Sequence, residues 1–235
     1  MRFASLGRVF AIARRRWDAL TLVVLTAVVY QPWNSPYLPL AEFAVFLVQR
    51  GSSHTLWGQF GGIAGYYIGQ GHLQLIEYLE MTLGAAAFGV WAGGWHWMYF
   101  AVMLSVLLAA RGLILKTGAT RIAAFAALAL FATMAPVAEG WIMPAGEPFA
   151  LLFVICALRL ALNYCDSDDW RRRAWLIAAC AIGVVFSREL VVSIMPAVWL
   201  LSRLRLRDRK WTWAQWTSRD AILLSVLAAA TVASM

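Results

Sequence analysis

Four ionisable side chains stand beside long apolar stretches, where they could do chemistry: Glu42, His72, Glu147 and Arg188. A glutamate can act as a general base, and a histidine here could bind phosphate or orient its loop. An arginine guanidinium is suited to phosphate recognition. Arg188 lies between two short apolar segments, where a charge is costly unless it has a task or a partner. These residues are the candidate site residues of the chain.

Each of the four also has a purely structural explanation. Glu42 suits the polar face of a surface helix, and His72 stands where a helix cap is common. Glu147 suits a helix N-terminus, because the helix dipole favours negative charge there. Arg188 could form an internal ion pair with Glu189 or Glu147. The residues alone leave both explanations open.

Two further acids, Glu77 and Glu80, lie inside the apolar stretch 73–91. Side chains three residues apart share one side of a helix, so both can face one cavity. They could line a substrate site, or they could belong to a buried network with Arg50 or Arg111. Both alternatives stay open at this point.

The elements that must position these residues are long and apolar. The chain has 235 residues, of which 62% are hydrophobic and 14% charged, whereas soluble domains carry about 25% charged residues. The mean hydropathy is +0.69. Several apolar runs approach the roughly 20 residues that a membrane-spanning helix needs. The composition therefore argues against a soluble domain and predicts an all-α polytopic membrane protein.

The basic residues are grouped between the apolar runs. The formal net charge is +8, and this grouping is the pattern by which positive charge marks cytoplasmic loops. We therefore assign the charge to topology and to anionic lipid headgroups, and we expect no nucleic-acid partner. The basic, amphipathic lead-in 1–16 is expected on the inner membrane surface. No cleavage site follows the first apolar run, so an uncleaved span with a cytoplasmic N-terminus is predicted.

The apolar runs divide the chain into three parts. A transmembrane module is expected over 17–205, after the lead-in 1–16, and a cytoplasmic linker with the start of a further span over 206–235. The predicted spans are 17–30, 73–91, 95–115, 122–135, 149–162, a hairpin of two short helices within 174–202, and 221–235. The last run has 15 residues, short of a full span, so the chain is predicted to be truncated.

A polar outer loop is expected over 31–72. Apolar residues at three- and four-residue spacing predict an amphipathic juxtamembrane helix at 38–49, and this helix carries Glu42. Glycines over 58–71 predict a flexible or tightly turning connection. If every apolar run crosses fully, the basic loop 111–121 lies outside. Either the stretch 73–91 does not cross the bilayer fully, or the positive-inside rule fails at that loop. We favour partial crossing, because Glu77 and Glu80 would be expensive in mid-bilayer.

Other kinds of site have no support in the sequence. Cys156, Cys165 and Cys180 have no metal-ligand spacing, and no structural disulfide is expected. No phosphate-binding glycine loop, zinc spacing or nucleophile triad is present. We predict no metal site and assign no cofactor.

The order of features resembles the N-terminal membrane module of the GT-C glycosyltransferases, over about residues 17–205. These enzymes carry an acidic residue in the first outer loop, where Glu42 falls, and a histidine at the turn into the second helix, where His72 falls in QGHLQL without the family's two prolines. They have a Glu-Pro start to a later span, matched by Glu147 in GEP. They often have a basic residue in the break of a short hairpin, where Arg188 falls in SRE.

The resemblance implies a function and roles. It implies transfer of a sugar from a polyprenyl-phosphate donor to an acceptor at the outer face of a membrane, the bacterial inner (plasma) membrane. Glu42 would be the catalytic base, with Arg188, His72 and Glu147 binding the donor phosphate and substrate. Many members have adjacent acids in the first loop, whereas Ala41 precedes Glu42 here, which argues against a divalent metal.

A second function class fits the same composition. A non-catalytic membrane protein, such as a transporter or an assembly subunit, would need no base in the outer loop. A transporter would depend on residues deeper in the bilayer, such as Glu77 and Glu80, and would be expected to show internal repeats. The sequence has no clear internal repeat.

Overall fold

A computed structural model describes residues 16–34, 55–69, 74–89, 91–134, 147–187, 195–207, 210–213 and 217–232. The described chain is mostly helical, which confirms the all-α prediction in its broad form. In chain order its elements are α2 (Trp17–Tyr30), α4 (Leu56–Ile68), α5 (Leu75–Phe88), α6 (Ala92–Lys116), α7 (Arg121–Thr133), α9 (Glu147–Ala161), η1 (Tyr164–Asp166), α10 (Trp170–Ser187), α11 (Met195–Arg203), β1 (Leu204–Arg207), β2 (Lys210–Trp213) and α12 (Ser218–Val232).

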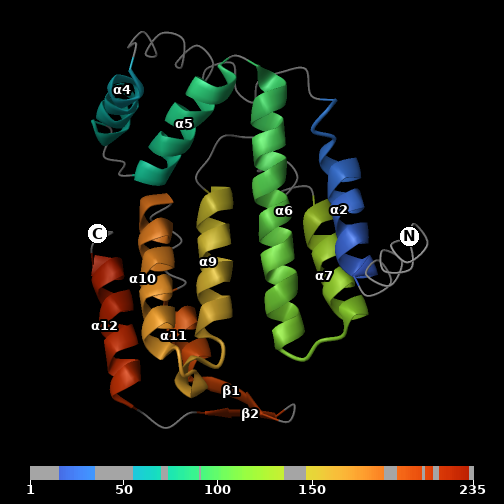
Figure 1. Ribbon diagram of the computed structural model, residues 1–235, viewed down its shortest axis with the longest axis vertical. Coiled ribbons are helices and arrows are strands. Elements are labelled where there is room, and N and C mark those ends of the chain that lie inside the picture. Colours follow the sequence, from blue (N-terminus) through green and yellow to red (C-terminus); the bar gives the residue numbers. More distant parts are fainter. Residues whose placement is uncertain are drawn as a thin grey trace, which may run out of the picture.

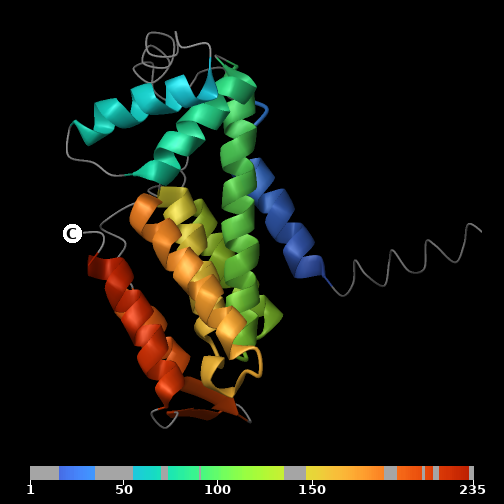
Figure 2. The same ribbon diagram turned by 60° about the vertical axis from the view of Figure 1, so that its left-hand side comes forward.

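The long helix α6 is the centre of the bundle (Figure 1). Helices α2 and α7 pack on one side of it, and α9 packs on another, followed by α10 and then α12. Helices α4 and α5 lie at the upper end in this view, and Figure 2 shows α4 running across that end. The described bundle is therefore a set of near-parallel helices with a helical layer over one end.

Helix α6 has 25 residues, a length of about 37 Å at 1.5 Å per residue. Among the described residues it is the one helix long and apolar enough to cross a membrane by length and composition. Three shorter apolar helices accompany it: Trp17–Tyr30, Arg121–Thr133 and Pro148–Ala161. Their positions agree within a few residues with the apolar runs from which helices were predicted.

The glycine-rich connection predicted over 58–71 is wrong, because α4 occupies most of it. The helix starts at a cap in which the Thr55 hydroxyl accepts a hydrogen bond from the Gly58 amide at 3.1 Å. At its other end the ring of Tyr67 stacks on Tyr78 of α5, with centroids 5.4 Å apart. Capping and packing therefore offset the low helix propensity of glycine.

The linker predicted after residue 205 also contains structure that the sequence analysis missed. Strands β1 and β2 form an antiparallel hairpin in which Leu204 pairs with Trp213 and Arg207 pairs with Lys210. The alternation of leucine and arginine in LRLR is the period-two pattern of a strand. The all-α prediction is thus wrong for this short hairpin. The predicted surface helix 38–49 lies outside the described residues.

Positive charge is concentrated at one end of the bundle. The C-termini of α6, α9 and α11 and the N-termini of α7, α10 and α12 all lie at the lower end in Figure 1. Every lysine and arginine among the described residues lies at that end or within two helical turns of it: Arg16, Arg111, Lys116, Arg121, Arg159, Arg171, Arg172, Arg173, Arg203, Arg205, Arg207, Lys210 and Arg219. The opposite end carries the acids Glu77 and Glu80 on α5.

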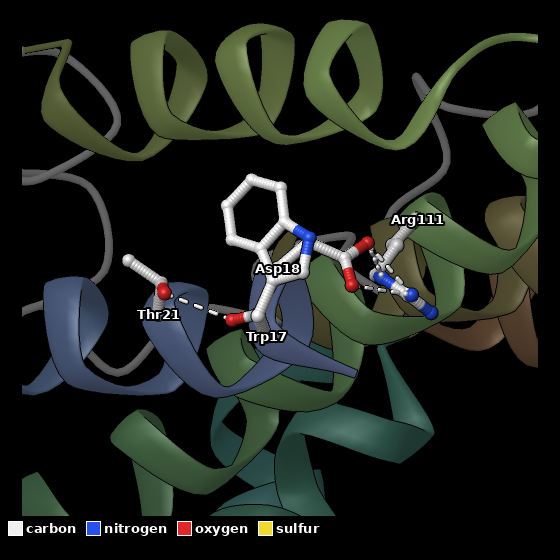
Figure 3. Close-up of polar contacts among 4 residues, drawn as sticks. All are labelled: Trp17, Asp18, Thr21 and Arg111. Atoms are coloured by element: carbon white, nitrogen blue, oxygen red, sulfur yellow. Dashed lines mark hydrogen bonds and ion pairs between the residues drawn. The ribbon is translucent and has the colours of Figure 1, made fainter. Parts of the chain in front are cut away.

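A buried ion pair joins α2 to α6 near the basic end (Figure 3). Arg111 donates from Nε to Asp18 Oδ2 at 2.7 Å and from Nη2 to Asp18 Oδ1 at 2.9 Å. Asp18 is 1% exposed and the Arg111 side chain 20% exposed. The proposed network of Arg111 with Glu77 and Glu80 is therefore wrong, because this guanidinium is engaged at the other end of the bundle.

Candidate functional site

Three of the four predicted site residues, Glu42, His72 and Arg188, lie outside the described residues. Glu147 is the first residue of α9, and only its backbone is described. The structure therefore gives no geometry among these four side chains. It does describe the helices to which their segments are joined.

Those helices meet at the end of the bundle that α4 and α5 cover (Figure 1). Leu75 begins α5 three residues after His72, and Ser187 ends α10 immediately before Arg188. Helices α5 and α10 are in contact, and α10 packs along α9. Figure 1 shows the start of α9, the end of α10 and the start of α5 at one level of the molecule. Three of the four candidate segments therefore join the same helical cluster.

A polar cluster is buried where α5 meets the first half of α6. Glu77, Glu80, His96 and Tyr99 are each less than 9% exposed. The Tyr99 hydroxyl donates a hydrogen bond to Glu80 Oε1. Buried polar groups are costly unless they are hydrogen-bonded, and this contact offsets part of that cost. Glu77 and Glu80 thus share one side of a helix, as their spacing predicted.

Glu80 of this cluster also lines a groove of about 500 Å³ between α5, α6 and α9. Its walls are almost wholly apolar, and among the described residues that line it Glu80 is the only ionisable one. The other lining residues are Ile76, Leu79, Leu83, Met98, Ala101, Val102, Ser105, Phe149, Leu152 and Phe153. The groove begins within one helical turn of Glu147 along α9. Such a groove suits a long apolar chain.

The partner of Glu80 was missed by sequence reasoning. Tyr99 follows Trp95 and Trp97 at the start of an apolar run, a position typical of aromatic residues at a membrane interface. It is 2% exposed and lies 19 residues from Glu80. The sequence did contain a signal. Glu80 lies in an apolar stretch, and a buried carboxylate needs a hydrogen-bond donor. The next apolar run carries Tyr99, whose hydroxyl can donate.

The described residues hold no group of three or more histidine, cysteine, aspartate or glutamate side chains that could bind a metal ion. The described free thiols, Cys156 and Cys180, lie on α9 and α10 and are partly buried. The chemistry that the described cluster supports is acceptance of protons or hydrogen bonds by the Glu77 and Glu80 carboxylates beside an apolar groove.

Comparisons of the sequence with protein-family models and with characterised proteins, and of the fold with solved structures, find no match. The resemblance to GT-C enzymes therefore depends on the sequence features alone.

Proposed function

We propose that this protein is an integral membrane glycosyltransferase that uses a polyprenyl-phosphate sugar at the outer face of a bacterial inner membrane. The observation that carries the proposal is the apolar groove between α5, α6 and α9, which is lined by Glu80. Along α6 its lining residues run from Met98 to Ser105, whereas Arg111 and Lys116 lie nearer the basic end. A polyprenyl chain is long and apolar, and its phosphate is polar. The groove supports binding of the apolar chain.

The membrane topology follows from the charge distribution. Basic residues favour the cytoplasmic side, so the lower end in Figure 1 would be cytoplasmic. Helix α2 would lead outward and α6 would return. Helices α4 and α5 would stay on the outer side as juxtamembrane elements. The segment 73–91 then does not cross, and the basic loop after α6 is cytoplasmic, so the number of spans agrees with the basic clusters.

Cysteine labelling tests this topology. In a variant with the three native cysteines replaced by alanine, cysteines introduced at Asn34 and Trp57 are expected to react with an impermeant maleimide in intact spheroplasts. Cysteines at Ala119 and Ser167 are expected to react only after permeabilisation, because they lie in the loops at the basic end. The reverse labelling pattern would overturn the orientation, and labelling of all four sites in intact spheroplasts would overturn the membrane assignment.

We assign the catalytic roles to the candidate residues that the sequence resemblance gives. A sugar hydroxyl or amide is a poor nucleophile, so a positioned base such as Glu42 would activate the acceptor. The polyprenyl-phosphate leaving group develops negative charge, which a cation stabilises strongly in a low-dielectric site. Arg188 and His72 would supply that stabilisation, and Glu147 would line the substrate site. Helices α5 and α9 line the groove and α10 packs against both, which supports this division of roles.

Filling the groove tests the function. Ala101 is exposed on α6 and lines the groove. Ala101→Phe is expected to raise the KM for a polyprenyl-phosphate sugar about tenfold, because overpacking costs roughly 1–3 kcal/mol. Transfer of labelled sugar is measured in membranes from cells that make the protein.

The matched control is Ala127→Phe on α7, an exposed alanine that does not line the groove. It is expected to leave the KM unchanged. Membranes that transfer no more sugar than membranes lacking the protein, across donors of differing sugar, would overturn the proposed function. Equal effects of the two variants would overturn the role of the groove.

A non-catalytic membrane protein, such as a transporter, is the second candidate. The buried acids Glu77 and Glu80 favour it, since ionisable residues within a membrane bundle often mark a transport pathway. Glu80→Gln would then abolish function, whereas Glu42→Gln would leave it intact.

A further inference from the structure

A second groove lies near the basic end of the bundle, between α10 and α12. Its volume is about 250 Å³, and it is lined by Trp170, Arg171, Ala174, Trp175, Ala178 and Ile222. From Arg171 to Ala178 it follows α10 for about 10 Å toward the middle of the bundle. One end of the groove is therefore basic and the remainder apolar.

Two guanidinium groups are held at the basic end by one indole ring. The Cζ atom of Arg171 lies 5.4 Å from the centroid of the Trp170 ring, and that of Arg219 lies 5.3 Å from it. Both distances are within the range of a cation–π contact. Arg171 comes from α10 and Arg219 from α12, so the ring brings two cations from different helices together. Asp168 and Asp169 are nearby in sequence but exposed, and neither lines the groove.

Two apolar residues that line the groove are exposed at the surface. Trp175 is 77% exposed and Ile222 is 46% exposed. Tryptophan is enriched at membrane interfaces, where its ring meets both lipid and headgroup. In the proposed orientation this end of the bundle is at the inner leaflet, so the exposed walls would contact acyl chains and the two arginines would lie at headgroup depth.

We propose that this groove binds one anionic phospholipid of the inner leaflet. Its phosphate lies against Arg171 and Arg219, and part of one acyl chain lies along Ala174 and Ala178. Basic pockets between membrane helices on the cytoplasmic side bind anionic headgroups in this way. Free phosphate would leave the apolar walls unused, and a zwitterionic lipid would bring no net charge to the two cations. The proposal depends on the membrane placement made above, but not on sugar transfer.

Lipid retention by the purified protein tests the site. The protein is transferred from its membrane into detergent and titrated with phosphatidylglycerol, and bound lipid is counted by native mass spectrometry. Arg171→Gln is expected to lower retention roughly fivefold, from the contribution of one basic residue near an anionic headgroup. Arg219→Gln is expected to do the same, and it provides the comparison if Arg171→Gln does not fold.

The matched control is Arg172→Gln, the next residue on α10, which is exposed and does not line the groove. It is expected to leave retention unchanged. Equal loss in this variant would overturn the proposal in favour of diffuse charge attraction. Equal retention of phosphatidylcholine, or displacement of the lipid by millimolar inorganic phosphate, would also overturn it. No sugar donor is present in this assay, so failure here is distinct from failure of the transferase proposal.

Discussion

Glu42→Gln is expected to lower sugar transfer by roughly a hundred- to ten-thousand-fold, the contribution of a positioned general base. Glutamine is nearly the same shape as glutamate, but its amide cannot accept the acceptor's proton. The binding surfaces are unchanged, so donor binding is expected to remain near the wild-type level. The measurement compares labelled product and donor titration curves in membranes that contain equal amounts of each protein.

The control for this variant is Glu139→Gln, which neutralises an acid between the predicted spans 122–135 and 149–162. It is expected to retain transfer within a few-fold of wild type. Wild-type product from Glu42→Gln would remove this residue as the base. Complete loss in both variants would show a general dependence on negative charge in the loops instead of a catalytic glutamate.

The helices of this protein could be predicted from sequence because apolar runs have a direct physical cause. A backbone buried among apolar side chains must satisfy its own hydrogen bonds, and a helix does so within one segment. The run 17–30 therefore became α2 with the same bounds. The strong run 95–115 became α6, which extends by a few residues at its N-terminus.

Local signals failed where packing between elements decided the structure. The glycines after Gly58 predicted a turn, yet a threonine cap and a stacked pair of tyrosines hold α4 as a helix. Added Cβ atoms at Gly61 and Gly65 would meet nothing, so these glycines serve no close approach. Glycine content alone therefore predicts an irregular backbone, but it does not decide the structure of a segment that a cap and a neighbouring helix hold as a helix.

The candidate site was predicted only in part. The spacing of Glu77 and Glu80 correctly placed them on one side of a helix, but their neighbours come from a segment that no local pattern connects to them. Tyr99 belongs to the next helix, and the groove adds residues of α9. The residues given by the GT-C resemblance, Glu42, His72 and Arg188, stay predictions, because they lie outside the described residues.

Asp18→Ala is expected to destabilise the protein by about 3 kcal/mol, the lower part of the range for breaking a buried ion pair. The lower value applies because the Arg111 side chain keeps 20% of its exposure and can recover some hydration. The lost contact is bidentate and joins two residues that are 93 apart in sequence, so neither Asp18 nor Arg111 has a replacement partner nearby in the chain. Unfolding of the detergent-purified protein, followed by helicity as the fraction of denaturing detergent rises, measures the change.

Two further variants separate the ion pair from the packing around it. Asp168→Ala removes an exposed aspartate at the same end of the bundle and is expected to change stability by less than about 0.5 kcal/mol. The double variant Asp18→Leu with Arg111→Leu leaves no unpaired charge, and it is expected to be more stable than Asp18→Ala, because replacing both partners removes the cost of a buried unpaired guanidinium. Equal stability of Asp18→Ala and Asp168→Ala would show that the ion pair contributes no more than an exposed one. Apolar residues alone would then stabilise the packing of α2 on α6.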